Sequence, residues 1–200
     1  MSEHYFSRTP QSESDPDHWS FSLLGHTFIF KTDRGVFSKR TVDFGSRLLI
    51  ETFRPPDLEG DILDVGCGYG PIGLALAKST GRTVHMVDIN ERALLLCREN
   101  ASLNQVANVR IYESDRLEGV REKDFAAIVT NPPVRAGKKV VYDIFEQSYD
   151  HLKAGGELWI VIQKKQGAPS AEKKLAEIFD EVEVVKKKKG YFIIKAKKLR

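Results

Sequence analysis

Asn131, Pro132 and Pro133 directly follow the apolar run 126–129. Proline has no backbone N–H and a fixed φ, so the two prolines end a strand and cannot begin a helix there. Asn131 and Pro132 each precede a proline and are therefore confined to extended backbone. This pattern predicts a stiff pair of hydrogen-bond acceptors: the side-chain carbonyl of Asn131, and the backbone carbonyl of Pro132 or one near it.

Acceptors of this kind suit a conjugated amine, such as the exocyclic nitrogen of guanine or adenine or a glutamine amide. The lone pair of such a nitrogen is delocalised, which makes it a poor nucleophile. Two acceptors that hold its N–H groups favour the pyramidal form and aim the lone pair at a methyl carbon. Asn131 and Pro132 are therefore candidate catalytic residues, and the alternative is a segment that only terminates a strand.

A glycine-rich segment, LDVGCGYGPIG (63–73), follows the first strand-like run of the alternating region and precedes a helical pattern. Residues 66–70, the glycine loop, contain three alternate glycines: Gly66, Gly68 and Gly70. Glycines at this spacing allow a tight turn and a close approach of backbone to a ligand. Asp88 ends the next strand-like run, where a carboxylate can accept hydrogen bonds from both hydroxyls of a ribose. These residues predict a cofactor that contains a nucleoside, with Ile89 as a further contact.

Two kinds of cofactor fit the glycine loop. Residues 68–73 match the dinucleotide pattern G-x-G-x-x-G, with Asp88 twenty residues after Gly68. Asp64 lies two residues before the first glycine, and an acid there disfavours a pyrophosphate but favours an ammonium and a sulfonium. No lysine occupies the loop, which excludes a Walker-type phosphate site. S-adenosylmethionine is favoured, and a nicotinamide dinucleotide is the alternative.

Ser114 and Asp115 follow the third strand-like run. A polar side chain at this point can bond the exocyclic amine of an adenine that lies over the strand ends. A simple turn or a helix cap is the alternative for both residues.

The motifs are separated by a regular alternation of apolar runs and helical patterns. The strand-like runs are 61–65, 83–88, 109–114, 125–130 and 157–163, and the helical patterns are 71–80, 91–104, 139–152 and 171–179. This alternation predicts a doubly wound α/β domain with a mostly parallel sheet and helices on both faces. Ligands of such sheets lie beyond the carboxyl ends of the strands, so the glycine loop, Asp88 and Asn131 are expected at one edge.

Both ends of the chain depart from the alternation. Runs 181–187 and 191–198, joined through Lys188, Lys189 and Gly190, predict an antiparallel hairpin at one side of the sheet. Residues 19–33 predict a small hairpin that turns near Gly25, and 42–53 a helix with Asp43 or Thr41 near its start. Residues 1–18 are polar and expected to be loosely held, which leaves one domain over 19–200.

Composition agrees with one globular domain that has no membrane span. The chain has 200 residues, of which 41% are hydrophobic and 30% charged. It has no apolar run long enough for a bilayer and no signal-like start, which predicts a cytoplasmic protein. Two cysteines without C-x-x-C spacing and five scattered histidines predict no structural metal.

The basic charge is concentrated at the carboxyl end. Residues 164–200 hold 12 Lys and Arg against 5 Asp and Glu, whereas residues 1–163 hold 19 against 23. A local excess of lysine attracts phosphate backbones through counterion release, and a solvated face kept for solubility is the alternative. Lysines 186–189 and the last few basic residues are candidates for RNA contact, with Lys138 and Lys139 near the Asn-Pro-Pro segment.

Taken together, DVGCGYG (64–70), Asp88 and NPP (131–133) resemble class I S-adenosylmethionine-dependent methyltransferases of the amino-methylating type. GVFSKRTVDFGSRLLIE (35–51) narrows the resemblance to the small-subunit ribosomal RNA guanine-N2 methyltransferase C-like family, over about 19–198. The resemblance implies a Rossmann-like seven-stranded sheet with an antiparallel last strand, S-adenosylmethionine as methyl donor, and guanine N2 of ribosomal RNA or the small ribosomal subunit as acceptor. It also implies that Phe37 and Ser38 line the cofactor cleft and that Asn131 holds the target amine.

Two departures from the family pattern affect the substrate. Relatives commonly carry a stacking aromatic after Asn-Pro-Pro, where this chain has Val134, so Arg135 or Tyr142 is expected to stack instead. Well-known relatives also carry a second, amino-terminal domain, for which 200 residues leave no room. Rival functions are methylation of adenine N6 or of a protein glutamine, a nicotinamide-dependent oxidoreductase, and a non-catalytic RNA-binding domain.

Overall fold

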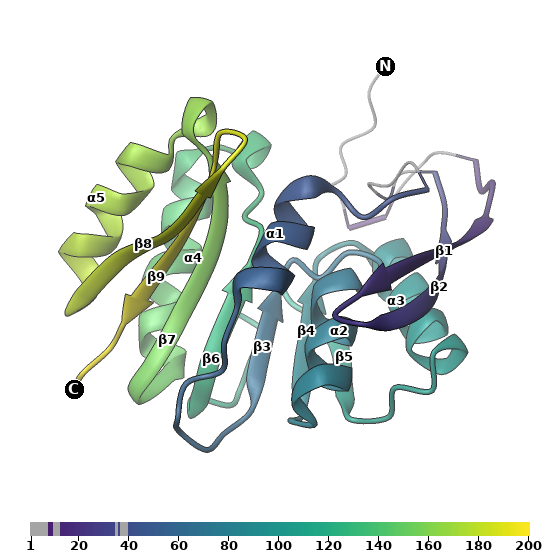
Figure 1. The fold of residues 1–200 in the computed structure, drawn as a ribbon, viewed down its shortest axis with the longest axis horizontal. Helices are drawn as coiled ribbons and strands as arrows, with labels where there is room; N and C mark the ends of the chain where they lie inside the picture. Colours follow the sequence, from purple (N-terminus) through teal and green to yellow (C-terminus); the bar gives the residue numbers. More distant parts are fainter. Residues whose placement is uncertain (1–7, 10–12, 35, 37–39) are drawn as a thin grey trace.

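The computed structural model describes residues 8–9, 13–34, 36 and 40–200. Phe37 and Ser38, which were predicted to line the cofactor cleft, lie outside the described residues. Figure 1 shows a central sheet with helices on both faces and a small two-stranded sheet beside it.

The seven strands of the large sheet run in the order β5-β4-β3-β6-β7-β9-β8. They are β3 (Ile62–Val65), β4 (Val84–Asp88), β5 (Val109–Glu113), β6 (Phe125–Thr130), β7 (Leu152–Gln163), β8 (Glu181–Lys188) and β9 (Tyr191–Lys197). Neighbours from β5 to β7 pair in parallel, and β9 is antiparallel to both β7 and β8. The predicted fold class is therefore confirmed, including the antiparallel last strand.

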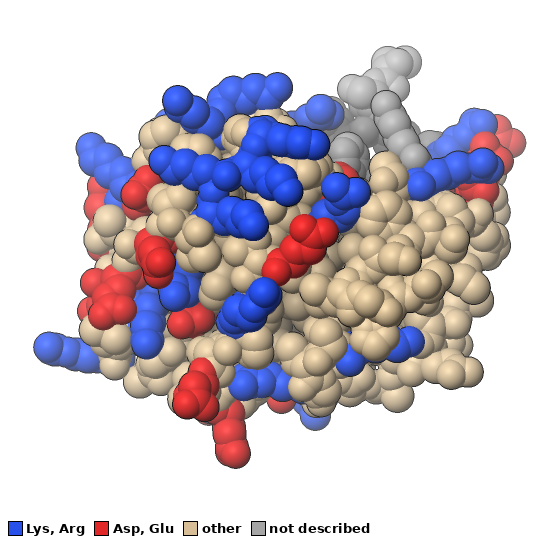
Figure 2. Space-filling model, viewed as in Figure 1, with Lys and Arg blue, Asp and Glu red and all other residues tan. Residues whose placement is uncertain are grey.

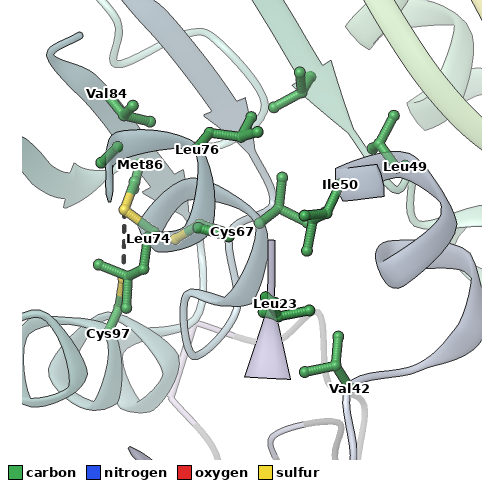
Figure 3. Close-up of a cluster of buried hydrophobic side chains, with 14 of the residues drawn as sticks. Leu23, Val42, Leu49, Ile50, Cys67, Leu74, Leu76, Val84, Met86 and Cys97 are labelled. Atoms are coloured by element: carbon green, nitrogen blue, oxygen red, sulfur yellow. Dashed lines mark hydrogen bonds between the residues drawn. The ribbon is translucent and has the colours of Figure 1, made fainter. Parts of the chain in front are cut away.

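Helices cover both faces of this sheet. They are α1 (Phe44–Thr52), α2 (Pro71–Thr80), α3 (Glu91–Leu103), α4 (Lys138–His151) and α5 (Ala168–Ile178), with 3-10 turns η1 (Val134–Ala136) and η2 (Lys164–Gln166). One buried cluster joins the sheet to α1, α2 and α3, and the other joins it to α4 and α5. Successive strand residues alternate between the clusters: Ile62 belongs to the first and Leu63 to the second. Figure 3 shows part of the first cluster, where the buried Cys97 donates to Met86 Sδ (4.0 Å).

The predicted amino-terminal hairpin consists of β1 (Asp17–Leu23) and β2 (His26–Thr32). Asn100 of α3 and Asn104, the C-cap of that helix, bind the backbone of β2 as a neighbouring strand would. Asn100 accepts from Lys31 N (2.7 Å) and donates to Lys31 O (3.0 Å), and Asn104 does the same with Ile29 (2.8 Å each). Asn100 Nδ2 also donates to Tyr69 O (2.8 Å). The hairpin is therefore attached to the glycine loop as well as to α3.

Part of the polar amino-terminal segment contacts the domain. The Arg8 side chain donates to Glu91 (3.2 Å) and lies 3.0 Å from Glu113, and Glu91 N donates to Arg8 O (3.0 Å). Ser14 Oγ donates to Asp33 (2.7 Å). Arg8 therefore contacts two carboxylates that lie far from it in the sequence, and the loose attachment of 1–18 stays a prediction.

Two features are absent from the described residues. No helix there is long and apolar enough to cross a membrane. No group of three or more histidine, cysteine, aspartate or glutamate side chains within the same residues is arranged to hold a metal ion.

Candidate active site

The sheet brings the glycine loop and the Asn-Pro-Pro segment together. The chain runs from β3 outward to β4 and β5, then returns to add β6 on the other side of β3, so the strand order reverses between β3 and β6. Val65 pairs with Thr130, and Thr130 Oγ1 donates to Val65 O (2.8 Å). Gly66 and Asn131 therefore leave the sheet side by side, at the point where open α/β sheets bind ligands.

The glycines of this region have different tasks. Gly66 is exposed with φ +74°, and nothing lies within 4 Å of the place where a Cβ would stand. At Gly70 a Cβ would meet Cys97 Sγ and Leu74 Cδ1 at 3.0 Å, and at Gly73 it would meet Met86 Cε at 2.5 Å. Gly70 and Gly73 thus serve packing, whereas Gly66 keeps one side of the loop open.

The backbone donors of the glycine loop are largely used within the protein. Four of them bind internal acceptors: Gly66 N and Cys67 N to Val87 O (2.8 and 2.9 Å), Gly68 N to Asp88 Oδ2 (2.9 Å), and Gly70 N to Cys67 O (3.0 Å). At the start of α2, Pro71 has no N–H and Gly73 N donates to Asp64 Oδ2 (3.0 Å). A pyrophosphate would meet two buried carboxylates here and few free donors. The site favours a cationic ligand over a dinucleotide.

Asp64 is buried beneath the glycine loop and does not lie at its mouth, where an acid two residues before the first glycine was expected. Every residue of β3 is buried because the strand is covered on both faces, and Asp64 is 0% exposed. Its Oδ2 accepts from Gly73 N, and its Oδ1 has no hydrogen-bond partner among the described residues. Burial raises the pKa of Asp64 to about 7, the Gly73 hydrogen bond opposes that rise, and the charge of Asp88 adds to it.

Asp88 shapes the loop at the end of β4. Its Oδ2 accepts from Gly68 N (2.9 Å), its Oδ1 accepts from Asn90 N (2.9 Å), and the side chain is buried. The end of a strand in such a sheet is where a ribose hydroxyl is expected to bond, and contact of Asp88 with a cofactor stays a prediction. Ile89 is half-buried next to it.

The side chain of Asn131 has a defined orientation. Its Nδ2 donates to Asp43 Oδ2 (3.2 Å) and to Ser46 Oγ (3.1 Å), both in the first turn of α1. An ionised carboxylate only accepts hydrogen bonds, so the atom that faces Asp43 is the nitrogen and Oδ1 points elsewhere. Asp43 is also the N-cap of α1, accepting from Ser46 N (3.0 Å), which decides between Asp43 and Thr41 as the start of this helix.

The carbonyl of Pro132 is partly used, contrary to the expected free array of acceptors. Val134 N donates to Pro132 O (2.8 Å), and Pro133 between them has φ −77° and ψ 71°. These are the angles of an inverse γ-turn, a bend of three residues that two successive prolines still permit. One lone pair of Pro132 O remains for a substrate.

Ser114 and Asp115 form a local turn. Ser114 Oγ donates to Arg116 O (2.8 Å) and accepts from Gly119 N (2.9 Å), while Asp115 pairs with the Arg116 guanidinium (3.2 Å). The hydroxyl of Ser114 therefore takes part in a turn, which was the alternative to a cofactor contact for this residue. Contact of either residue with a cofactor stays a prediction.

The predicted stacking residues lie in different environments. Tyr142 packs between α4 and α5, with its hydroxyl donating to Ser170 O (3.4 Å) and Lys174 Nζ 5.6 Å from its ring centre. Arg135 is exposed in η1, directly after Val134. Of the two candidates, Arg135 is the one that remains exposed beside the Asn-Pro-Pro segment.

Sequence reasoning missed the partnership of Asp43 and Ser46 with Asn131. Asn131 is 85 to 88 residues away from Ser46 and Asp43, and no local sequence pattern indicates that these side chains are in contact. In the sequence, Asp43 and Ser46 indicate only a helix cap and its third residue, so no signal for the contact with Asn131 was present.

Residues 27–195 match the model of the methyltransferase small domain. The chain belongs to that family. It is 63% identical to the uncharacterized protein YbxB of Bacillus subtilis (strain 168) over 100% of both chains. It is 32% identical to the ribosomal RNA small subunit methyltransferase C of Vibrio cholerae serotype O1 (strain ATCC 39541), over 90% of this chain and 52% of that protein.

A solved structure agrees with this assignment. The fold superposes on the T. thermophilus 16S rRNA N2 methyltransferase RsmC, solved in complex with AdoMet and guanosine, with a TM-score of 0.82 at 28% identity. The match covers 92% of this chain and 50% of that one. The chain thus spans about half the length of these two methyltransferases, and the family resemblance seen in the sequence is confirmed.

Proposed function

We propose that this chain transfers a methyl group from S-adenosylmethionine to guanine N2 of ribosomal RNA, in the cytoplasm. The observation that carries the proposal is the position of Asn131 beside Gly66, with its amide nitrogen bound to α1. Asn131 Oδ1 has no hydrogen-bond partner among the described residues, and Asn131 follows β6 at the edge of the sheet where Gly66 follows β3.

The residues of the loop fit the cofactor. Gly66 leaves open space where any Cβ would intrude, and the buried carboxylate of Asp88 lies at the end of β4, where a ribose is expected to bind. Asp64 and Asp88 are buried carboxylates close enough to affect each other's ionisation, and a nearby cation offsets their repulsion. When bound, S-adenosylmethionine supplies a methyl group on a sulfonium, which a nucleophilic nitrogen can accept.

The chain's own task is to prepare that nitrogen. Asn131 Oδ1 accepts one N–H of the target amine, and the remaining lone pair of Pro132 O accepts the other. Both acceptors are fixed before the substrate arrives, Asn131 by Asp43 and Ser46 and Pro132 by its turn, so little reorganisation is needed in the transition state. As the N–C bond forms and the methyl–sulfur bond breaks, the nitrogen becomes cationic, and its proton is then lost without a strong base.

The acceptor is the finer part of the proposal. An asparagine and a proline carbonyl can also hold adenine N6 or a glutamine amide, so these two are the alternatives. The two named methyltransferases support ribosomal RNA, since both are described as acting on it. The basic end of the chain supports a nucleic acid over a protein substrate.

Methyl transfer can be tested with purified protein, radiolabelled S-adenosylmethionine and ribosomal RNA from cells that lack the protein. We expect incorporation by the natural protein, with N2-methylguanosine as the labelled nucleoside after digestion. Asn131→Ala should lower the rate about 100-fold or more, by analogy with the loss of one oxyanion donor. Asn108→Ala, at a turn asparagine that donates to Ala77 O and Arg82 O on the other edge of the sheet, is the control. Equal rates for Asn131→Ala and the natural protein would remove the proposed role.

A further inference from the structure

A basic hollow lies at the carboxyl edge of the sheet, on the side of β7 and β9. It measures about 500 Å³ and is lined by Gln163, Lys164, Lys165, Lys189 and Gly190. These residues come from the end of β7, from η2 and from the β8–β9 turn. Lys164 N donates to Gly190 O (2.8 Å), which holds the two walls of the hollow together.

The basic hollow is connected to Asn131 through Tyr191 and Phe44. Gln163 Nε2 donates to Tyr191 Oη (2.5 Å), and the Tyr191 ring lies 5.3 Å from the ring of Phe44. Lys189 Nζ, from the hollow, lies 5.0 Å from the centre of the same Phe44 ring. Phe44 directly follows Asp43, which accepts from Asn131 Nδ2. A continuous row of contacts therefore joins the hollow to the residue proposed to hold the target amine.

The charge of the basic hollow is not neutralised by the protein. Within the described part of the chain, Lys164, Lys165 and Lys189 form no ion pair with a carboxylate, and no acid lines the hollow. Other lysines near the carboxyl end do have partners: Lys195 pairs with Glu183 (3.2 Å), and Lys198 Nζ donates to Tyr149 O and Leu152 O (2.9 Å each). Figure 2 shows a dense group of Lys and Arg over the β8–β9 turn, and lysines 186–188 of that turn are exposed as well.

We propose that the basic hollow binds the backbone phosphate of a nucleotide next to the target nucleotide in an RNA strand. The proposal rests on the proposed function and adds the site that positions the strand. Three ammonium groups without a carboxylate partner among the described residues surround a concave surface, which suits a phosphate and its sugar. Gln163 Oε1, a buried acceptor without a partner among the described residues, can be satisfied by a ribose hydroxyl. A glutamine in a protein substrate would need neither feature.

The test measures the binding of a fluorescent, single-stranded oligoribonucleotide of mixed sequence as a function of salt. The test variant is Lys164→Ala/Lys165→Ala/Lys189→Ala. The matched control, Arg121→Ala/Lys123→Ala/Lys173→Ala, removes the same charge from three exposed residues without ion pairs, two of them at the opposite edge of the sheet.

We expect the hollow variant to bind RNA roughly tenfold less tightly in low salt, and the slope of log affinity against log salt to decrease by about 2. The control should stay within about twofold of the natural protein, and the cofactor affinity, measured by calorimetry, should be the same in all three. Equal losses in both variants would overturn the proposal, because general charge would then explain binding. Competition by polyglutamate as effective as that by unlabelled RNA would also overturn it.

Methylation assays separate this proposal from the proposed function. If the natural protein methylates RNA and the hollow variant does so with an unchanged KM, the hollow is not the strand's binding site although the function stands. If no nucleic acid is methylated but the hollow variant alone loses RNA binding, the hollow is supported and the proposed function fails.

Discussion

Replacing Gly66 by alanine separates cofactor binding from folding. Gly66 has φ +74°, no atom within 4 Å of the new Cβ, and an N–H that donates to Val87 O. The methyl group therefore clashes with nothing in the protein and leaves this hydrogen bond in place. It occupies only the open side of the loop, where the cofactor is proposed to lie. Gly81 is a matched control, since it has φ +69° and equally open surroundings at the far end of α2.

Both substitutions carry the same backbone cost. An alanine held in the left-handed region loses about 1 to 2 kcal/mol of stability. For a domain of this size, that lowers the melting temperature by roughly 2 to 8 °C. Against this equal background, a ligand at 100 times its dissociation constant adds about 2.7 kcal/mol, or roughly 5 to 10 °C. One extra methyl group in a packed contact costs about 1 to 3 kcal/mol, so Gly66→Ala should weaken cofactor binding roughly 5- to 150-fold.

Calorimetric titration with S-adenosylmethionine, together with melting curves in its presence and absence, measures both quantities. We expect equal melting temperatures for the two variants without the cofactor, a normal thermal shift in Gly81→Ala, and a shift that is lost or much reduced in Gly66→Ala. If Gly66→Ala bound the cofactor as tightly as Gly81→Ala, the open side of the loop would not be the cofactor's place.

Three further predictions concern the groups around the site. The serine of Asp43→Ser still caps the helix but is too short to reach Asn131, so kcat for methylation should fall about tenfold while the free energy of unfolding changes by less than about 1 kcal/mol. The control Asp43→Asn retains an acceptor and should preserve most of the rate. A normal kcat in Asp43→Ser would contradict the orienting role of Asp43. The pKa of Asp64 is raised to about 7, so the folded protein holds this proton more tightly than the unfolded chain, and the free energy of unfolding falls as pH rises toward 7. Between pH 5 and pH 8, urea unfolding should show a decrease of up to about 3 kcal/mol from this group, and Asp64→Asn should lack that decrease. Equal decreases in both proteins would refute the role of Asp64. Asn100→Ala removes three hydrogen bonds that join α3 to β2 and to the glycine loop. The free energy of unfolding should therefore drop by about 2 to 4 kcal/mol, and the backbone amide of Lys31 should exchange faster with deuterium. Unchanged exchange would mean that other contacts hold the hairpin.

The local features of the fold were predictable from the sequence because local physics decides them. Three alternate glycines require a turn after a strand, and the run 71–80, opened by proline and followed by Gly81, has the bounds of α2. Paired prolines end β6 at Thr130. The strand alternation then puts both motifs at one edge of a parallel sheet, which follows from topology alone.

Long-range contacts were not predictable. Nothing near Asn131 in the sequence indicates that Asp43 and Ser46 hold its amide, because the contact depends on where α1 lies over the sheet. The depth of Asp64 depends on helices that cover both faces of β3, and an acid in a strand looks the same in the sequence whether it is buried or exposed. The turn at Pro133 was missed for another reason: proline disfavours a helix, yet a three-residue bend needs only the N–H of Val134.

We propose that an exocyclic amine of RNA is methylated at the edge of the sheet between Gly66 and Asn131. The decisive experiment is nucleoside mass spectrometry of ribosomal RNA from cells with and without this protein. We expect N2-methylguanosine at one position to be lost without the protein and to be restored by the natural protein, but not by Asn131→Ala. An identical set of modified nucleosides in both cells, or the loss of a methyl group from a ribose hydroxyl or a ring carbon, would contradict it.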